Sequence, residues 1–301
     1  YPTIQAAIDN ANEGDIVFVG SGSYHEYVVV NKAVSLIGEN AASTFIEFNG
    51  GGNVVTLVSD NITISGFTIR SPGFQSDQGV WLRHTSNNDR IYGNNIVNCS
   101  TGIYLNGSSS NIISGNNLED CPYGIYLSWI HFSSSNNSIS GNSIVDSEIF
   151  GIGLYGSSGS NSISCNNITE SVDYGIYLES SNNNVLDNNI ANIHYYGILL
   201  EPTSGNNTIS GNSIENNTYG IWLSAPSNNS IYHNNFIDNK KQAEVSFSNV
   251  WDNGLPSGGN YWSDYLMKYP DATEIDETGI GDTPYVIDEN NVDHYPLVAP
   301  L

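Results

Sequence analysis

The sequence predicts an all-β fold, a parallel β-solenoid with three strands in each coil. A motif close to Gly-Asn-Asn/Ser-Ile starts at positions 93, 115, 141, 165, 187, 211 and 233, so successive copies lie 22, 26, 24, 22, 24 and 22 residues apart. A second motif, Gly-Ile-x-Leu, follows it with a similar period. The three short apolar patches of a repeat, such as those at Ile209, Ile214 and Ile221, show no helical spacing. A repeat of this length is typical of a solenoid.

One asparagine occupies the same place in every copy of the first motif. When coils stack in register, each side-chain amide can donate a hydrogen bond to one neighbour and accept one from the other. The preference of asparagine for turns explains the residue type but not the column. We therefore predict an internal ladder formed by Asn94, Asn116, Asn142, Asn166, Asn188, Asn212 and Asn234.

The two ends of the chain differ from the repeats and are expected to cap them. The segment from Thr3 to Asn12 carries Ile4 and Ile8 on one side, which predicts an amphipathic helix over the open end of the first coil. The tail is rich in tryptophan, tyrosine and proline and leaves the repeat pattern. The expected organisation is a capping helix at residues 1–13, a β-helix at 14–248 and a loop-rich cap at 249–301.

The charge balance limits the partners of the chain. Lys and Arg number 7 against 31 Asp and Glu, for a formal net charge of −24. Nucleic acid is excluded because phosphate binding needs clustered cations. An acidic polysaccharide is disfavoured unless a divalent cation bridges the two, and solubility is explanation enough for the acidity. No apolar run reaches the roughly 18 residues of a membrane span. Because the chain starts at Tyr1, we expect a mature or trimmed portion of a longer product.

The three cysteines allow at most one disulfide. Cys99 and Cys121 each lie three residues after the Ile or Leu of their motif, so they occupy one column in neighbouring coils. Coils about 4.8 Å apart place two such Cα atoms within the range that a disulfide tolerates. A bridge and a stacked pair of buried thiols both remain open, while Cys165 takes the place of the motif glycine.

Two parts of the chain carry a resemblance to known families. The series Thr-Ile-Gln-Ala-Ala-Ile-Asp, Gly-Asp-x-Val-x-Val, Gly-x-Tyr-x-Glu and Lys-x-x-x-Leu-x-Gly is similar to the first coils of many pectin-lyase-like right-handed β-helices. The Asn-Asn-x-Ile-x-Gly-Asn repeat and the tail, with Gly-Gly-Asn-Tyr-Trp-Ser-Asp-Tyr at 258–265, resemble the NosD-like family, abundant in methanogenic archaea as surface and secreted proteins. The resemblance implies a single-stranded right-handed parallel β-helix, located outside the cell or on its surface.

The resemblance also implies copper handling, because the family is named after a periplasmic factor in copper delivery to nitrous oxide reductase. Delivery of a soft metal needs Met, Cys and His close together. The chain has 1 Met, 3 Cys and 6 His, without a His-x-His or Cys-x-x-Cys pair. A copper-handling maturation factor is therefore the least favoured function. The histidines are His25, His84, His131, His194, His233 and His294.

An acidic, glycine-containing segment of the tail resembles a calcium loop that NosD-like proteins often carry. Oxygen ligands at such spacing suit calcium. Glu277 and Thr278 interrupt the family pattern before Gly279, and an acidic surface loop is the alternative. The candidate calcium ligands are Asp271, Asp276 and Asp282, with Glu274 between them.

Two columns of carboxylates are candidates for catalysis on a sugar. Glycoside hydrolases use two carboxylates about 5 to 10 Å apart. Glu179 and Glu201 follow the Leu of Gly-Ile-x-Leu in neighbouring coils. A second column lies two residues after the motif Ile or Leu, where strict alternation would bury it, so a turn is expected to expose it. Its members are Asp120, Asp146 and Glu170. Both columns are also compatible with solvated faces.

The strongest candidate for binding is a column of aromatic residues. In Gly-Ile-x-Leu the Ile and Leu are expected to point inward and position x outward. Exposed flat rings at coil spacing form a surface on which sugar rings can stack. The alternatives are that strands favour aromatic residues or that a neighbouring subunit covers them. The candidates are Trp81, Tyr104, Tyr126, Tyr177 and Trp222, interrupted by Gly153 and Leu199. A second column of undetermined direction precedes the motif glycine, at Tyr123, Phe150, Tyr174, Tyr196 and Tyr219.

These observations favour a secreted or cell-surface β-helix protein without catalytic activity. It would bind a polysaccharide or other glycan, or serve as an envelope or adhesion module that packs against copies of itself or neighbouring envelope proteins. The main alternative is a carbohydrate-active enzyme, either a glycoside hydrolase or a polysaccharide lyase. A lyase would need its base near Arg70 to Arg90, because no Lys or Arg occurs between Arg90 and Lys240.

Overall fold

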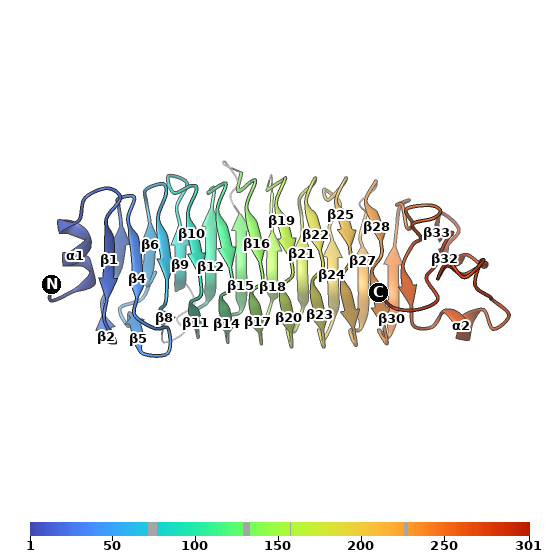
Figure 1. Cartoon of the computed structure of the whole chain (residues 1–301), viewed down its shortest axis with the longest axis horizontal. Coiled ribbons are helices and arrows are strands. Elements are labelled where there is room, and N and C mark those ends of the chain that lie inside the picture. The colour runs from blue at the N-terminus through green and yellow to red at the C-terminus, as the bar shows by residue number, and fades with distance from the viewer. Residues whose placement is uncertain (72–76, 129–132, 157, 226–227) are drawn as a thin grey trace. The chain divides into compact units, whose positions relative to one another are not determined.

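The chain is a right-handed parallel β-helix built from three parallel sheets, as the sequence predicts (Figure 1). The structure is a computed structural model that describes residues 1–71, 77–128, 133–156, 158–225 and 228–301. Two compact units make up the chain, Tyr1–Asn161 and Ser162–Leu301, and each is described by itself. No helix among the described residues is long and apolar enough to cross a membrane.

The first unit begins with helix α1 (Ile4–Asn10), and its strands then pass in turn through three sheets. The first sheet holds β1 (Ile16–Val19), β4 (Ser35–Gly38), β7 (Thr63–Ser65), β10 (Arg90–Tyr92), β13 (Ile112–Ser114) and β16 (Ser138–Ser140). The second holds β2 (Gly22–His25), β5 (Thr44–Glu47), β8 (Thr68–Arg70), β11 (Asn95–Val97), β14 (Asn117–Glu119) and β17 (Ser143–Val145). The third holds β3 (Val28–Val30), β6 (Val55–Leu57), β9 (Gln78–Leu82), β12 (Thr101–Asn106), β15 (Tyr123–Ser128) and β18 (Phe150–Leu154).

The second unit repeats this order and ends in a separate hairpin. Its first sheet holds β19 (Ser162–Ser164), β22 (Asn184–Leu186), β25 (Thr208–Ser210) and β28 (Ser230–Tyr232). The second holds β20 (Asn167–Thr169), β23 (Asn189–Ala191), β26 (Ser213–Glu215), β29 (Asn235–Ile237) and β31 (Tyr261–Trp262), and the third holds β21 (Tyr174–Leu178), β24 (Tyr196–Leu200), β27 (Tyr219–Leu223) and β30 (Lys241–Val245). Helix α2 (Tyr265–Lys268) and the antiparallel strands β32 (Tyr285–Asp288) and β33 (Asn291–Asp293) complete the tail.

The glycine of the first motif marks a corner at which the chain must turn sharply. Gly93 and Gly115 have φ angles of +63° and +60°, in the left-handed region that glycine adopts without a steric penalty. Where the motif carries another residue, as at Cys165 and His233, the backbone keeps the same conformation, with φ of 55° and 58°. The motif therefore encodes the corner between the first and second sheets.

The predicted asparagine ladder is present inside both units. In the first unit, the Nδ2 group of Asn94 donates to Oδ1 of Asn116 at 3.1 Å, and Asn116 donates to Asn142 at 3.0 Å. In the second unit, the same bond runs from Asn166 through Asn188, Asn212 and Asn234 to Asn260, with distances of 3.0, 2.9, 2.8 and 2.9 Å. All of these side chains are buried, so the ladder satisfies polar groups that the turn places inside the coil.

A second asparagine ladder, which the sequence analysis did not identify, lines the corner between the third and first sheets. All of its members except Asn249 follow a residue in the left-handed conformation, and within each unit each donates its backbone N–H to the Oδ1 atom of the next. They are Asn111, Asn137 and Asn161 in the first unit and Asn183, Asn207, Asn229 and Asn249 in the second.

Helix α1 is attached to the first coil through its two ends. The Thr3 side chain caps its N-terminus by accepting from the backbone N–H of Ala6 at 3.1 Å. The Glu26 carboxylate accepts from the backbone N–H groups of Ile4 and Gln5, at 2.8 and 3.0 Å. The Lys32 ammonium donates to three carbonyl groups near the C-terminus of the helix. Each charge matches the sign that stabilises that end of a helix.

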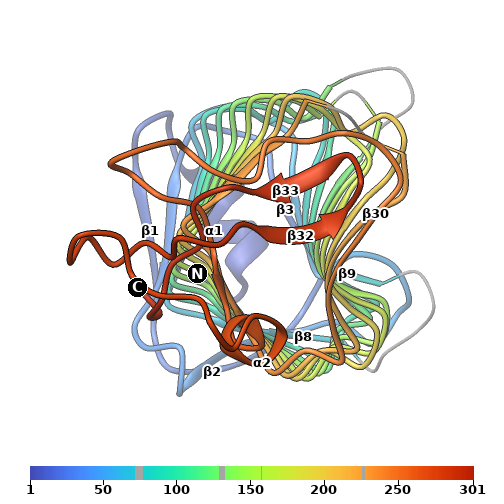
Figure 2. The ribbon, with the colours of Figure 1, turned by 90° about the vertical axis from the view of Figure 1, so that its right-hand side faces the viewer.

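The hairpin β32–β33 lies across the end of the second unit (Figure 2). Its side chains end both asparagine ladders of this unit. Asn291 accepts from the backbone N–H of Asn249 at 3.0 Å, and Asp293 accepts from that of Asn260 at 2.7 Å. Trp251 and Trp262 donate their indole N–H groups to the same two side chains, at 3.0 and 2.9 Å. Strand β31 pairs with β29, so coil structure continues into the tail as far as Trp262.

The cysteines are free thiols in the structure. Cys99 and Cys121 are buried, and a hydrogen bond joins their side chains, which raises the pKa of the Cys99 thiol and lowers that of Cys121. Of the two alternatives left open by the sequence, the structure shows the stacked thiols. Cys165 is exposed at its corner.

Candidate functional site

The predicted aromatic column lies in register on the third sheet of each unit. Tyr104 pairs with Trp81 on one side and Tyr126 on the other. All three side chains are half-buried, as expected for residues that point away from the core. The Trp81 ring also contacts the guanidinium group of Arg83, 5.3 Å from its centre.

In the second unit, the prediction of an exposed column is wrong for Tyr177. This side chain is 8% exposed, and Leu199, which follows it in register, is 2% exposed. The ring of Tyr174 packs against that of Tyr177, with centroids 5.3 Å apart, and so covers it. Trp222, the next residue in the column, is half-buried and keeps access to solvent.

In the second unit the second aromatic column lies on the same outer face, whereas Phe150, its member in β18 of the first unit, is fully buried. In β27 the burial pattern places Gly220 and Ile221 inward, so that Tyr219 and Trp222 both face outward. Their ring centroids are 6.2 Å apart, and the Tyr196 ring lies 5.1 Å from Tyr219 and 4.8 Å from Trp222. The rings of Tyr174 and Tyr196 continue the stack at 5.6 Å. We call Tyr174, Tyr196, Tyr219 and Trp222 the aromatic face of the second unit.

The rings of this face stack on one another. Tyr174 and Tyr196 are inclined by 14°, and Tyr196 and Tyr219 by 24°. At centroid separations near 5 Å, such rings overlap in an offset stack. Neighbouring rings therefore cover part of each other's faces, and the edges with their phenol groups have more access to solvent. In the first unit Tyr104 and Tyr126 stack in the same way, at 5.1 Å and 14°.

The candidate catalytic carboxylates lie beside this face and at a corner. Glu179 and Glu201 follow Leu178 and Leu200, which pair in register, and both are half-buried. Asp120, Asp146 and Glu170 are exposed at the corner between the second and third sheets, with φ of 53°, 58° and 61°. The expected turn and exposure of this second column are confirmed. A catalytic role for either column stays a prediction.

The candidate calcium ligands of the tail do not form a cluster of three, and calcium binding stays a prediction. Asp271, Asp276 and Asp282 do not gather, since the described residues contain no group of three His, Cys, Asp or Glu side chains that could hold a metal ion. The Asp282 carboxylate instead accepts hydrogen bonds from the backbone and hydroxyl groups of Thr273, at 2.9 and 2.7 Å, which lower its pKa. The Asp282 carboxylate therefore organises an exposed turn. Of the six histidines, His131 lies outside the described residues.

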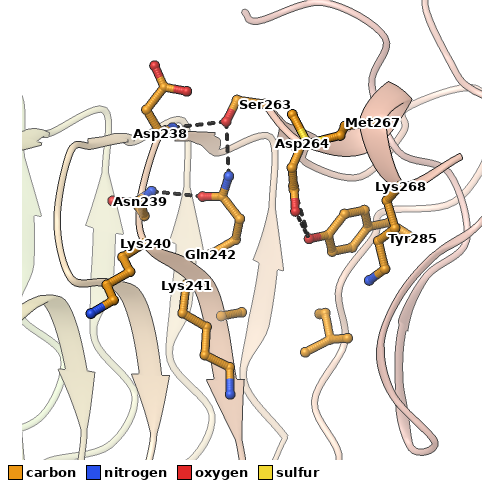
Figure 3. A pocket seen from close by; sticks show the side chains of 12 residues that line it. Asp238, Asn239, Lys240, Lys241, Gln242, Ser263, Asp264, Met267, Lys268 and Tyr285 are labelled. Atoms are coloured by element: carbon orange, nitrogen blue, oxygen red, sulfur yellow. Dashed lines mark hydrogen bonds between the residues drawn. The ribbon is translucent and has the colours of Figure 1, made fainter. Parts of the chain in front are cut away.

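A pocket of about 530 Å³ lies in the second unit between strand β30 and the tail (Figure 3). The repeat pattern does not predict it, because its walls come from three separate segments of the chain, at 238–243, 263–268 and 285–287. Lys240 and Lys241 line it at the start of β30, and Lys268 lines it at the end of α2. The ring of Tyr285 forms part of its wall, and the Asp264 carboxylate accepts from the Tyr285 hydroxyl at 3.1 Å.

The architecture defines the class of protein, a right-handed parallel β-helix with an aromatic outer sheet and capped ends. The family described as "Periplasmic copper-binding protein (NosD)" matches residues 8–149 and 58–267. The chain therefore belongs to the NosD family. No curated protein matches the sequence.

Solved structures with the same fold share little sequence with this chain. Geobacillus virus E2 ORF18 superposes with a TM-score of 0.65 at 17% identity, covering 94% of this chain and 63% of its own. This chain thus spans less than two thirds of that protein. The alginate lyase from Paenibacillus sp. str. FPU-7 gives 0.60 at 17% identity, with 86% and 94% covered. The GH87 α-1,3-glucanase catalytic unit from Streptomyces thermodiastaticus strain HF3-3 gives 0.56 at 15%, with 87% and 63% covered.

Proposed function

We propose that this protein binds a glycan along the aromatic face of its second unit, outside the cytoplasm and without cleaving it. The observation that carries the proposal is the half-buried cluster of Tyr196, Tyr219 and Trp222 on the outer side of the third sheet. Tyrosine and tryptophan place a large apolar ring next to a polar group. That combination suits a sugar, which presents both C–H faces and hydroxyl groups.

The stacked arrangement would make this a rigid binding surface. Each ring is held by its neighbours at 4.8 to 5.6 Å, so little side-chain entropy would be lost when a ligand binds. Phenol edges would donate and accept hydrogen bonds, and the indole of Trp222 would offer apolar contact. A phenol is protonated at neutral pH and can donate a hydrogen bond, and burial moves the pKa of Tyr174 and of Tyr196 further upward.

The comparisons support a glycan as the partner. Two of the similar structures carry names of enzymes that act on polysaccharides, an alginate lyase and an α-1,3-glucanase. The description of the NosD family as periplasmic supports a place outside the cytoplasm. The proposal of glycan binding rests on the aromatic face rather than on the copper binding named in that description.

The experiment is a glycan array followed by calorimetry on the bound glycans. Replacing Tyr219 and Trp222 by alanine is expected to weaken binding about 3- to 10-fold each, the scale of an aromatic contact. Tyr232→Ala is the matched control, since Tyr232 is a half-buried aromatic residue on the first sheet of the same unit. Equal affinities in all three variants and the wild type would contradict the proposal.

Hydrolysis of the bound glycan is the second candidate function, favoured by the register that places Glu179 and Glu201 at the ends of adjacent strands. Incubation with each array-positive glycan and assay of new reducing ends, which hydrolysis of a glycosidic bond produces, separates the two. Binding without products is expected. Products that disappear in Glu179→Gln and Glu201→Gln, but not in Asp146→Asn, would establish the enzyme instead.

A further inference from the structure

The pocket between β30 and the tail concentrates positive charge in a strongly acidic chain. Lys240, Lys241 and Lys268 line it, and they are three of only 7 Lys and Arg residues in a chain of net charge −24. The lining also contains Asp238 and Asp264. In Figure 3 the Asp238 carboxylate points away from the three ammonium groups.

Two of the three ammonium groups lack an acidic partner. Lys241 forms an ion pair with Glu244. In the described ranges, neither Lys240 nor Lys268 has a carboxylate within ion-pair distance. Lys268 instead donates to the carbonyl of Val286 and lies 4.2 Å from the centre of the Tyr285 ring. An anion entering the pocket would supply the missing counter-charge, and charge-assisted hydrogen bonds to an ammonium group are strong ones.

The opposite wall of the pocket is held in place by a chain of hydrogen bonds. Asn239 donates to Gln242 at 2.9 Å, and Gln242 donates to the Ser263 hydroxyl at 3.0 Å. The backbone N–H of Asp238 donates to the same hydroxyl at 2.9 Å. Asp264 is occupied by the Tyr285 hydroxyl. The wall is therefore pre-organised, and its carboxylate is turned to the tyrosine.

The pocket continues the aromatic face. Strand β30 pairs with β27, so that Lys241 follows Tyr219 and Glu244 follows Trp222 in register. Adjacent strands lie about 4.8 Å apart, a distance comparable to the length of one sugar ring. A glycan that lies across Tyr196 and Tyr219 would therefore reach Lys241 with its next residue.

We propose that this pocket binds the carboxylate of an acidic sugar residue at the end of a glycan that lies on the aromatic face. The inference rests on the glycan binding proposed above and specifies its ligand. Because the whole chain repels a polyanion, the ligand carries its acid group at the lysine cluster and is neutral along the tyrosines.

The test compares two sets of tetrasaccharides, terminated by glucuronic or galacturonic acid, with their carboxyl-reduced neutral counterparts, by calorimetry. The acidic member of a pair is expected to bind about 10-fold more tightly. Lys240→Gln is expected to reduce this preference, and Lys240→Gln with Lys268→Gln to abolish it, because these two ammonium groups have no acidic partner among the described residues, while affinity for the neutral counterpart stays unchanged. Lys240→Arg should retain the preference. Arg90→Gln removes one exposed charge from the first unit and is the matched control.

The outcomes separate this inference from the proposed function. Equal binding of acidic and neutral members, still weakened by Tyr219→Ala, would overturn the acidic subsite and leave glycan binding intact. A preference that survives the double lysine variant would also overturn it. Failure of every tetrasaccharide to bind would contradict both.

Discussion

Asp89 occupies a ladder position that asparagine fills in the following coils, and replacing it by asparagine tests the role of its charge. The side chain is 1% exposed. Its carboxylate accepts from the backbone N–H of Ile62 at 2.8 Å and from the Ser86 hydroxyl. One coil further on, Asn111 donates its Nδ2 group to the equivalent hydroxyl, Ser108, at 2.7 Å. An asparagine at position 89 can therefore keep both contacts, because the serine hydroxyl can turn to accept.

The expected effect follows from proton linkage. Burial raises the pKa of Asp89 to about 7, from about 3.9 in an unfolded chain. The folded state holds the proton more tightly than the unfolded state, so the free energy of unfolding falls as the pH rises from about 4 through about 7. A shift of about 3 units corresponds to about 4 kcal/mol in total, of which about 2–3 kcal/mol is lost between pH 5 and pH 8.

Urea unfolding followed by circular dichroism measures this difference. Asp89→Asn should gain about 2–3 kcal/mol relative to the wild type between about pH 5 and pH 8, because the amide does not ionise. Asp120→Asn, at an exposed corner, is the control and should leave the pH profile parallel to that of the wild type. If Asp89→Asn also ran parallel to the wild type, the buried carboxyl would not be titrating in this range and the reasoning would be refuted.

Two further predictions concern the inside of the coil. Asn212→Ala removes the acceptor of two hydrogen bonds from Asn188 and the donor of one to Val185, all of them buried. The free energy of unfolding, measured by urea titration, should fall by about 3 kcal/mol or more. Asn216→Gly, at an exposed corner, should change it by less than about 1 kcal/mol, and similar losses in the two variants would argue against the ladder as a stabiliser. Gly197→Ala would place a Cβ atom 2.6 Å from the carbonyl oxygen of Gly220 in the next coil and should lower the free energy of unfolding by about 1–3 kcal/mol. Gly20→Ala, whose Cβ would meet only the Glu39 carboxylate, at 4.0 Å, is the control, and thermal unfolding measures both variants.

Much of the fold could be predicted because each coil repeats the same residue types at the same places. The motif glycine and its substitutes take a left-handed corner, and the asparagine after it turns inward. The second ladder, at Asn111 and its successors, repeats with a comparable period and could have been found by the same argument. It was missed because the surrounding serines and asparagines resemble an ordinary polar turn.

The site could be predicted only in part, for reasons of side-chain packing. Register placed the columns correctly, but the direction of a ring depends on the rings beside it. Tyr177 is buried because Tyr174 packs over it, and strand alternation alone does not contain that information. The same limit applies to the carboxylates of the tail. Their sequence pattern suggested calcium ligands, whereas the Asp282 carboxylate accepts hydrogen bonds from the hydroxyl and backbone N–H groups of Thr273.

The sequence by itself determined the coil, its period, its parallel sheets and the inward asparagines, because these follow from residue types at fixed spacing and each coil contacts mainly its neighbours. The tertiary structure decided which surfaces are available to a ligand. The lysine pocket unites the start of β30 with α2 and β32, segments brought together only by the way the tail closes the last coil. The stacking of Tyr196 on Tyr219 likewise depends on two coils meeting in register. Interactions within and between neighbouring coils follow from the repeated residues, whereas contacts between the repeats and the cap form only when the chain folds.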